Sequence, residues 1–154
     1  MSKSKSTSSF PKREQRISKA MGLAEFAYLA GLIDGEGTIF VIRRPPRLEN
    51  PLGTYHLRLQ IVNTDWRLIL WLQDNFGAKV ATLCKGTSKW KRSWSAMWYT
   101  GYAKEVIKLI QPYLIIKKEQ ASIALEFPTD KERMPEKRRE LYMELKVLNR
   151  KGPK

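Results

Sequence analysis

The spacing of apolar residues changes along the chain from a helical period to an extended one and back. Between residues 23 and 33, apolar side chains recur at i, i+3, i+4 and i+7, which is the stripe of an amphipathic helix facing a core. Between residues 54 and 62 they alternate with polar ones, which predicts a half-buried β-strand. The helical stripe consists of Phe26, Leu29, Ala30 and Ile33, and the apolar side of the strand of Tyr55, Leu57, Leu59 and Ile61.

The remaining patterns complete a mixed domain. Asp65 follows the strand just described and is a good N-cap for a helix, which Gly77 is placed to end. Segments rich in β-branched and aromatic residues predict three more strands. We expect strands at 38–43, 79–85 and 94–100, and helices at 65–75, 102–110, 117–127 and 134–148. The resulting order is αββαββα followed by two further helices.

The last predicted strand leaves one question open. Trp94 and Trp98 lie on the same face of it, but a period of two does not tell whether that face is buried. The preceding loop, 87–92, is dense in Lys and Arg around Trp90. Its aromatic and cationic side chains could contact nucleic-acid bases, and the alternation of Trp94 and Trp98 is equally compatible with core positions.

The charge of the chain narrows the class of partner. With 29 Lys and Arg against 15 Asp and Glu, the 154 residues carry a formal net charge of +14, which indicates nucleic acid or an acidic membrane surface. No apolar run is long enough to span a bilayer. The single Cys84 excludes an intramolecular disulfide, and the single His56 excludes catalysis by several histidines. We expect an intracellular location, in a prokaryotic cytoplasm or an organelle matrix.

The two ends of the chain differ in composition from its middle. Residues 1–15 are rich in Ser and Lys and poor in large apolar residues, which predicts a disordered basic tail. A transit peptide is less favoured, because no Arg precedes Arg13 and no amphipathic stripe is present. Residues 16–150 then form one domain, a length that suits a single core, and 151–154 form a frayed C-terminus.

The most informative stretch is 29–37, which reads LAGLIDGEG. It begins as an apolar helix and ends in a turn where acidic residues alternate with glycines. Gly31 and Gly35 lie four residues apart, on one helix face, where a second backbone could approach closely. Carboxylates such as Asp34 and Glu36 would repel one another where two helices meet, unless a cation lies among them. The stretch therefore suggests a divalent metal site at a helix–helix contact.

This stretch closely resembles the signature of the LAGLIDADG homing endonucleases, with seven identities in nine residues. Only Gly35 and Glu36 differ, where the family has Ala and Asp, and the resemblance extends over about residues 25–148. It implies an α+β fold, an αββαββα core with C-terminal helices, whose antiparallel sheet forms a DNA-binding saddle. Because the chain holds one copy of the motif, it also implies a homodimer that cuts a long pseudo-palindromic DNA target and leaves short 3′ overhangs.

The resemblance also assigns roles to individual residues. Glu36 takes the place of the metal-binding acid, with Gly35 beside it, and the implied cofactor is Mg²⁺ or Mn²⁺. Lys117 follows a Gln-Pro-aromatic-Leu segment and matches a catalytic-site lysine, with Lys118 as its rival. Asp34 is expected to cap the tight turn. The polar residues implied around the attacking water are Asn63 and Arg67. The implied dimer interface consists of Leu29, Ala30, Gly31, Ile33 and Asp34.

A basic surface is expected on the strands and their loops. On the polar side of strand 54–62, arginine can pair with guanine edges and glutamine with adenine edges. A merely solvated strand face is the alternative interpretation. The expected DNA-binding residues are Arg44, His56, Arg58, Gln60, Lys85, Lys89, Lys91 and Arg92.

Two other functions would use the same scaffold. An RNA-binding maturase, which helps its host intron to fold, would need the same basic surface and would bind intron RNA. Intact acidic residues do not exclude it, because maturases can retain them. A non-catalytic transcription factor would need an appended helix-turn-helix, for which the chain has no room. We therefore favour the nuclease.

Overall fold

The computed structural model describes residues 17–49, 51, 53–129 and 134–150, so the predicted basic tail (1–15) and frayed end (151–154) lie outside the described residues. The order of elements is the predicted one, with a 3₁₀ turn added after the third helix. The helices are α1 (Leu23–Glu36), α2 (Trp66–Phe76), α3 (Thr100–Ile110), η1 (Gln111–Tyr113), α4 (Lys118–Leu125) and α5 (Pro135–Arg150). The strands are β1 (Gly37–Arg44), β2 (Thr54–Asn63), β3 (Lys79–Cys84) and β4 (Ser93–Tyr99). Within this described part, no helix has the length and apolarity needed to cross a membrane.

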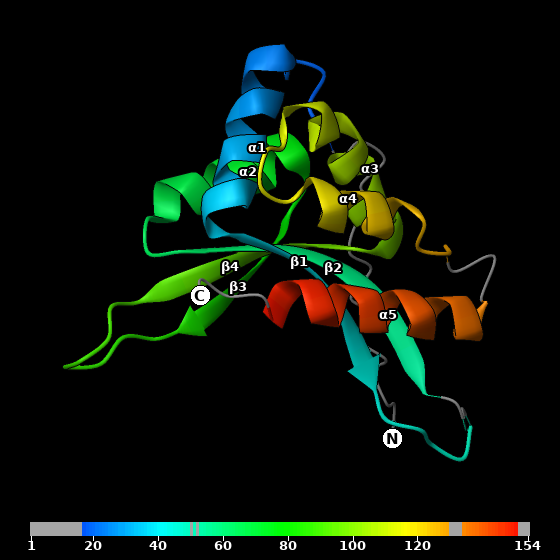
Figure 1. Cartoon of the computed structure of the whole chain (residues 1–154). Helices are drawn as coiled ribbons and strands as arrows, with labels where there is room; N and C mark the ends of the chain where they lie inside the picture. The colour runs from blue at the N-terminus through cyan, green and yellow to red at the C-terminus, as the bar shows by residue number, and fades with distance from the viewer. Residues whose placement is uncertain (1–16, 50, 52, 130–133, 151–154) are drawn as a thin grey trace, which may run out of the picture.

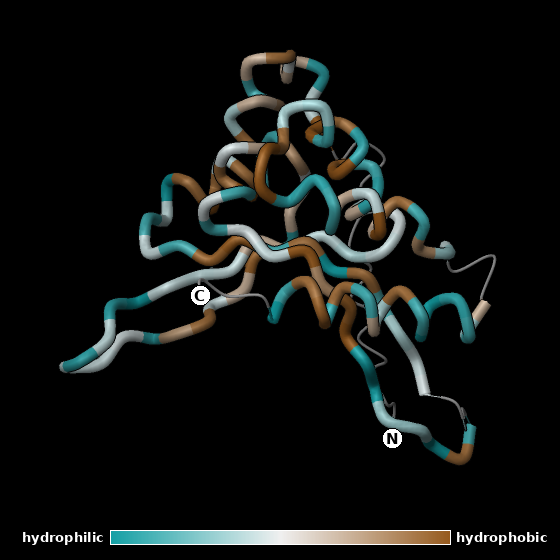
Figure 2. Tube along the Cα trace, in the orientation of Figure 1, coloured by the Kyte–Doolittle hydropathy of each residue, from teal (hydrophilic) through white to brown (hydrophobic). Residues whose placement is uncertain are grey.

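The four strands form one antiparallel sheet in the order β1-β2-β4-β3. β2 and β4 are therefore central, and each has its hairpin partner on the outer side. In Figure 1, α1 to α4 lie on one side of the sheet, while the β1–β2 and β3–β4 hairpins run away from them and diverge. The sheet thus arches over an open space, as predicted for a saddle. Figure 2 shows hydrophilic residues at the tip of the β3–β4 hairpin and apolar ones where the strands pass beneath the helices.

The helix-facing side of the sheet forms the core. The register places Leu59 of β2 between Ile39 of β1 and Trp98 of β4, and all three side chains are buried. Trp98 also donates its Nε1–H to the carbonyl of Phe76 at 2.7 Å. This answers the question that the alternation left open: Trp94 and Trp98 both face the helices, Trp98 buried and Trp94 half-buried.

The predicted ends of α2 are confirmed, whereas the end of α1 was placed too early. Asp65 caps α2 by accepting the backbone N–H of the second residue after it, and Gly77 ends the helix with φ at 65°, where glycine is least costly. α1 continues three residues beyond Ile33, so its acidic residues lie in the last helical turn. Gly37 then allows a tight passage into β1, because a Cβ there would lie 2.7 Å from the Cα of Ile33.

The last helix, α5, packs along the edge strand β1 and is fixed near both of its ends. Asn149 donates its side-chain N–H to the carbonyl of Ile39 at 2.9 Å. The buried guanidinium of Arg138 donates to the carbonyls of Tyr55 and Pro128 at 2.9 and 3.1 Å. One edge of the sheet is therefore covered through contacts to its backbone.

Candidate active site

The C-terminal end of α1 lies beside the end of β2. β1 continues directly from α1 and pairs with β2 so that Gly37 is opposite Ile61, which brings Asn63 level with the last residue of the helix. The Nδ2 of Asn63 donates to Oε2 of the exposed Glu36 at 2.7 Å. Two residues that the resemblance assigns to the site, 27 positions apart in the sequence, are therefore in direct contact.

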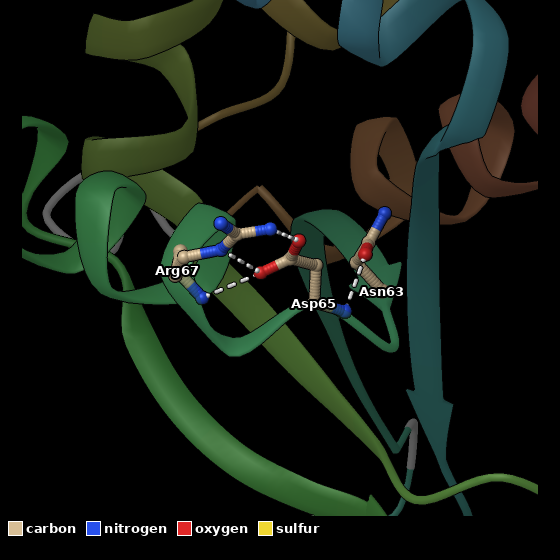
Figure 3. Close-up of polar contacts among 3 residues, drawn as sticks. All are labelled: Asn63, Asp65 and Arg67. Carbon is tan, nitrogen blue, oxygen red and sulfur yellow. Dashed lines mark hydrogen bonds and ion pairs between the residues drawn. The ribbon is translucent and has the colours of Figure 1, made fainter.

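A string of polar contacts continues from Asn63 (Figure 3). Its Oδ1 accepts the backbone N–H of Asp65 at 2.7 Å. The Asp65 carboxylate accepts the backbone N–H, Nε–H and Nη2–H of Arg67 at 2.9, 3.1 and 2.7 Å. The hydrogen bonds from Arg67 lower the pKa of Asp65 to about 2. Arg67 is thus held in place by Asp65 although its side chain is exposed, and the site residues of β2 and α2 form one connected group with Glu36.

Lys117 reaches the same end of α1. Its Nζ donates to the carbonyls of Ile33 and Asp34, both at 2.7 Å. Burial lowers the pKa of Lys117, and the nearby Asp34 carboxylate partly opposes this effect. The rival Lys118 is exposed at the first position of α4. The geometry therefore favours Lys117 as the lysine of the site.

Asp34 positions this lysine in a way that the sequence did not reveal. Rather than capping its own turn, its carboxylate accepts the backbone N–H groups of Ile115, Ile116 and Lys117 at 2.8, 3.2 and 3.0 Å. The segment between η1 and α4 is therefore attached to the last turn of α1. Its partners lie 81 to 83 positions further along the chain, so no local pattern could have indicated them.

The predicted dimer interface is wrong for three of its five residues. Leu29, Ala30 and Ile33 are fully buried within the chain itself, because they form the core-facing stripe of α1, and no surface is left for a second chain. The exposed side of the helix carries Gly31 and Gly35, where an added Cβ would meet nothing within 4 Å. Packing inside this chain therefore does not require glycine at either position.

One chain offers only part of a metal site. Within the residues that the structure describes, no three or more His, Cys, Asp or Glu side chains lie together in a way that could hold a metal ion. The exposed carboxylate of Glu36 uses one oxygen for the bond from Asn63, and Gly35 can add only its backbone. The oxygen chemistry suits Mg²⁺, but the residues present would fit it only if a second chain supplied further ligands.

The expected DNA-binding residues lie on the open side of the sheet and on the two hairpins. The register places Arg58 and Gln60 on the side of β2 that faces away from α1 to α4. The guanidinium carbon of Arg58 lies 4.8 Å from the ring centre of Tyr99 and 5.9 Å from that of Phe40. Its Nε has no hydrogen-bond partner in the described part of the chain. The other members of the set are His56 on the same side of β2, Arg44 at the end of β1, and Lys85, Lys89, Lys91 and Arg92 between β3 and β4.

Comparison with solved structures identifies the fold. The homing endonuclease I-CvuI in complex with its target superposes with a TM-score of 0.69 at 19% identity, over 86% of each chain. The archaeal intron-encoded homing endonuclease I-Vdi141I complexed with DNA gives 0.64 at 13% identity, over 84% of this chain and 86% of that one. The meganuclease I-SmaMI bound to uncleaveable DNA gives 0.62 at 21% identity, over 82% of this chain but 45% of that one. No protein-family profile and no curated protein sequence matches the chain. The chain has the LAGLIDADG homing-endonuclease fold, as the motif predicted.

Proposed function

We propose that this chain is one subunit of a homodimeric, metal-dependent endonuclease that cuts double-stranded DNA at a specific, long site. The observation that carries the proposal is the grouping of Glu36, Asn63, Arg67 and Lys117 at one end of α1. These are the residues that the family resemblance assigns to hydrolysis, and three separate segments of the chain bring them together.

A second copy of the chain would complete the site. Joining two copies through the exposed side of α1, over Gly31 and Gly35, would bring the two Glu36 carboxylates towards each other and supply the ligands that one chain lacks. The relative lengths of the similar structures support this arrangement. I-CvuI matches over 86% of both chains, whereas this chain spans only about half of I-SmaMI, which therefore has room for two such units. A two-fold dimer implies a pseudo-palindromic target.

The residues of the site suit phosphodiester hydrolysis. A divalent cation held by Glu36 would supply charge relief at the phosphate and an activated water. Asn63 orients the Glu36 carboxylate through its 2.7 Å hydrogen bond, as outer residues of metal sites do. Arg67, fixed by Asp65, presents a cation beside the same group. Lys117 is a further cation whose pKa burial lowers, so it gives up a proton more readily than an exposed lysine.

The surface below the sheet suits a DNA duplex. The chain carries a net charge of +14, and its diverging hairpins present cations on either side of an open space. Arg58, stacked on Tyr99, has a buried N–H without an acceptor among the described residues, which is costly for the protein alone. We assign base contacts to Arg58 and Gln60, and phosphate contacts to the hairpin lysines.

The test uses selection, because the target sequence is unknown. Random duplexes bound by the protein in Ca²⁺ are enriched, and the bound pool is then supplied with Mg²⁺ or with EDTA. We expect cutting at matching positions of both strands, with 3′ overhangs, in Mg²⁺ only. Glu36→Gln should abolish cutting and keep binding, whereas Glu144→Gln, an equal charge change on the exposed side of α5, should leave both unchanged.

Cutting by the Glu36→Gln protein would contradict the assignment of the site. Selective binding of the parent chain without any cutting in Mg²⁺ or Mn²⁺ would contradict the nuclease proposal. That result would favour the maturase alternative, which intron splicing measured with and without the protein would then examine.

A further inference from the structure

Two tryptophans form an exposed aromatic surface beside the candidate hydrolytic residues. Trp66 is the first residue of α2, and Trp94 lies in β4 opposite Asn63. Their ring centres are 5.0 Å apart with the planes inclined at 50°. The side chain of Trp66 remains 40% exposed. No other described residue covers it as a core residue would be covered, so this pair offers a flat apolar surface to a ligand.

Cations surround this aromatic pair. The guanidinium carbon of Arg92 lies 5.4 Å from the ring centre of Trp94. Two adjoining hollows, of about 460 and 520 Å³, share Trp66, Trp94 and Arg92 in their walls, and Lys91 lines the first. The one carboxylate in the lining belongs to Asp65 and is already bonded to Arg67. The hollow is therefore both aromatic and positively charged.

This combination fits a nucleotide. A base can stack on an indole whatever its sequence, and the phosphate next to it can take up the neighbouring cations. Neither an apolar ligand nor an inorganic anion would use both parts of the hollow.

The position of the hollow selects an unpaired nucleotide. Trp94 points to the helix-facing side of the sheet, together with Ala96 and Trp98, so a duplex on the open side would not reach it. A single strand is flexible enough to pass around the sheet. The hollow is also adjacent to the site, because Asp65 in its wall is bonded to Asn63, which holds Glu36.

We propose that Trp66, Trp94, Arg92 and Lys91 form a binding site for an unpaired nucleotide of a DNA strand. The proposal rests on the proposed function in one respect: a staggered cut at Glu36 would produce such nucleotides next to this hollow. The site would hold a cut end on the enzyme and so delay release of the product.

The experiment measures binding of a labelled hexathymidylate by fluorescence anisotropy, in EDTA, where cutting plays no part. We expect Trp66→Ala and Arg92→Ala to weaken binding about tenfold, within the range for the stacking of one base. Trp66→Phe, which keeps an aromatic face, should restore most of the affinity. Matched controls are Trp90→Ala and Lys89→Ala, an exposed tryptophan and an exposed lysine outside the hollow, and they should bind as the parent does.

Three results would overturn the proposal: no binding of the hexanucleotide by the parent chain, equal losses in the control variants, or losses of Trp66→Ala that extend equally to an intact duplex. Competition by thymidine monophosphate at the same concentration as the hexanucleotide would assign the hollow to a free nucleotide instead of a strand. Glu36→Gln should bind the hexanucleotide as the parent does, so a failure of the nuclease proposal is measured separately.

Discussion

Replacing Asp34 by Asn should loosen the segment that carries Lys117. The Asp34 carboxylate accepts three backbone N–H groups, at 2.8, 3.2 and 3.0 Å, from residues 115–117. The amide keeps one acceptor oxygen but loses the charge, and its NH₂ group faces at least one backbone donor. Hydrogen bonds to a charged group contribute about 1.5–3 kcal/mol each, and the lower end applies because this group is only half-buried.

We therefore expect Asp34→Asn to lower the free energy of unfolding by about 2–3 kcal/mol. For a domain of this size the midpoint of thermal unfolding would fall by roughly 5–10 °C. Both quantities are to be measured at one fixed protein concentration, since dimerisation would make them depend on it. Cutting should slow more than binding weakens, because Lys117 is held by the same contacts.

The matched control is Asp74→Asn, the same chemical change at an exposed position of α2. It should change the free energy of unfolding by less than about 0.5 kcal/mol. The reasoning would be refuted if Asp34→Asn were no less stable than this control, because the three hydrogen bonds would then contribute nothing beyond those of an exposed carboxylate.

Three further results are expected. Asn63→Ala frees the Glu36 carboxylate and should slow single-turnover cutting about ten- to a hundredfold with DNA binding retained; unchanged cutting would show that Glu36 needs no such support. Trp98→Phe leaves the buried carbonyl of Phe76 without its donor and should lower the free energy of unfolding by about 1–3 kcal/mol, measured with urea. Asp65, whose pKa is lowered to about 2 from 3.8, stabilises the folded state above pH 3.8 and loses this contribution as the pH falls towards 2. Asp65→Asn should flatten that part of the acid unfolding curve, and an unaltered curve would contradict the assigned pairing.

The parts of the fold that the sequence predicted well are those set by neighbouring residues. Asp65 and Gly77 fix the ends of α2 through contacts within a few positions, and the alternation in β2 fixes its two faces without knowledge of any partner. The face of Trp94 and Trp98 required the sheet order, because only the pairing of β2 with β4 places Trp98 opposite Leu59 in the core.

The site was predictable where a family motif covers it and not beyond. Glu36, Asn63 and Lys117 follow from the resemblance, but their contacts depend on β1 pairing with β2 and on a segment returning to α1. The buried side of α1 shows the limit of a motif. Leu29 belongs to the same conserved-looking stretch as Gly31, yet the helix turns one towards the core and the other towards solvent.

The diverging hairpins divide the protein into parts with different freedom to change. Lys89 and Lys91, near the tip of the β3–β4 hairpin, are exposed and add little to the core, so substitutions there can accumulate without loss of stability. Arg58 and Tyr99, in the middle of the sheet, are stacked on each other and constrain one another. A lineage of such proteins would therefore acquire new outer target bases quickly and central ones slowly, and laboratory recoding should begin at the hairpins for the same reason.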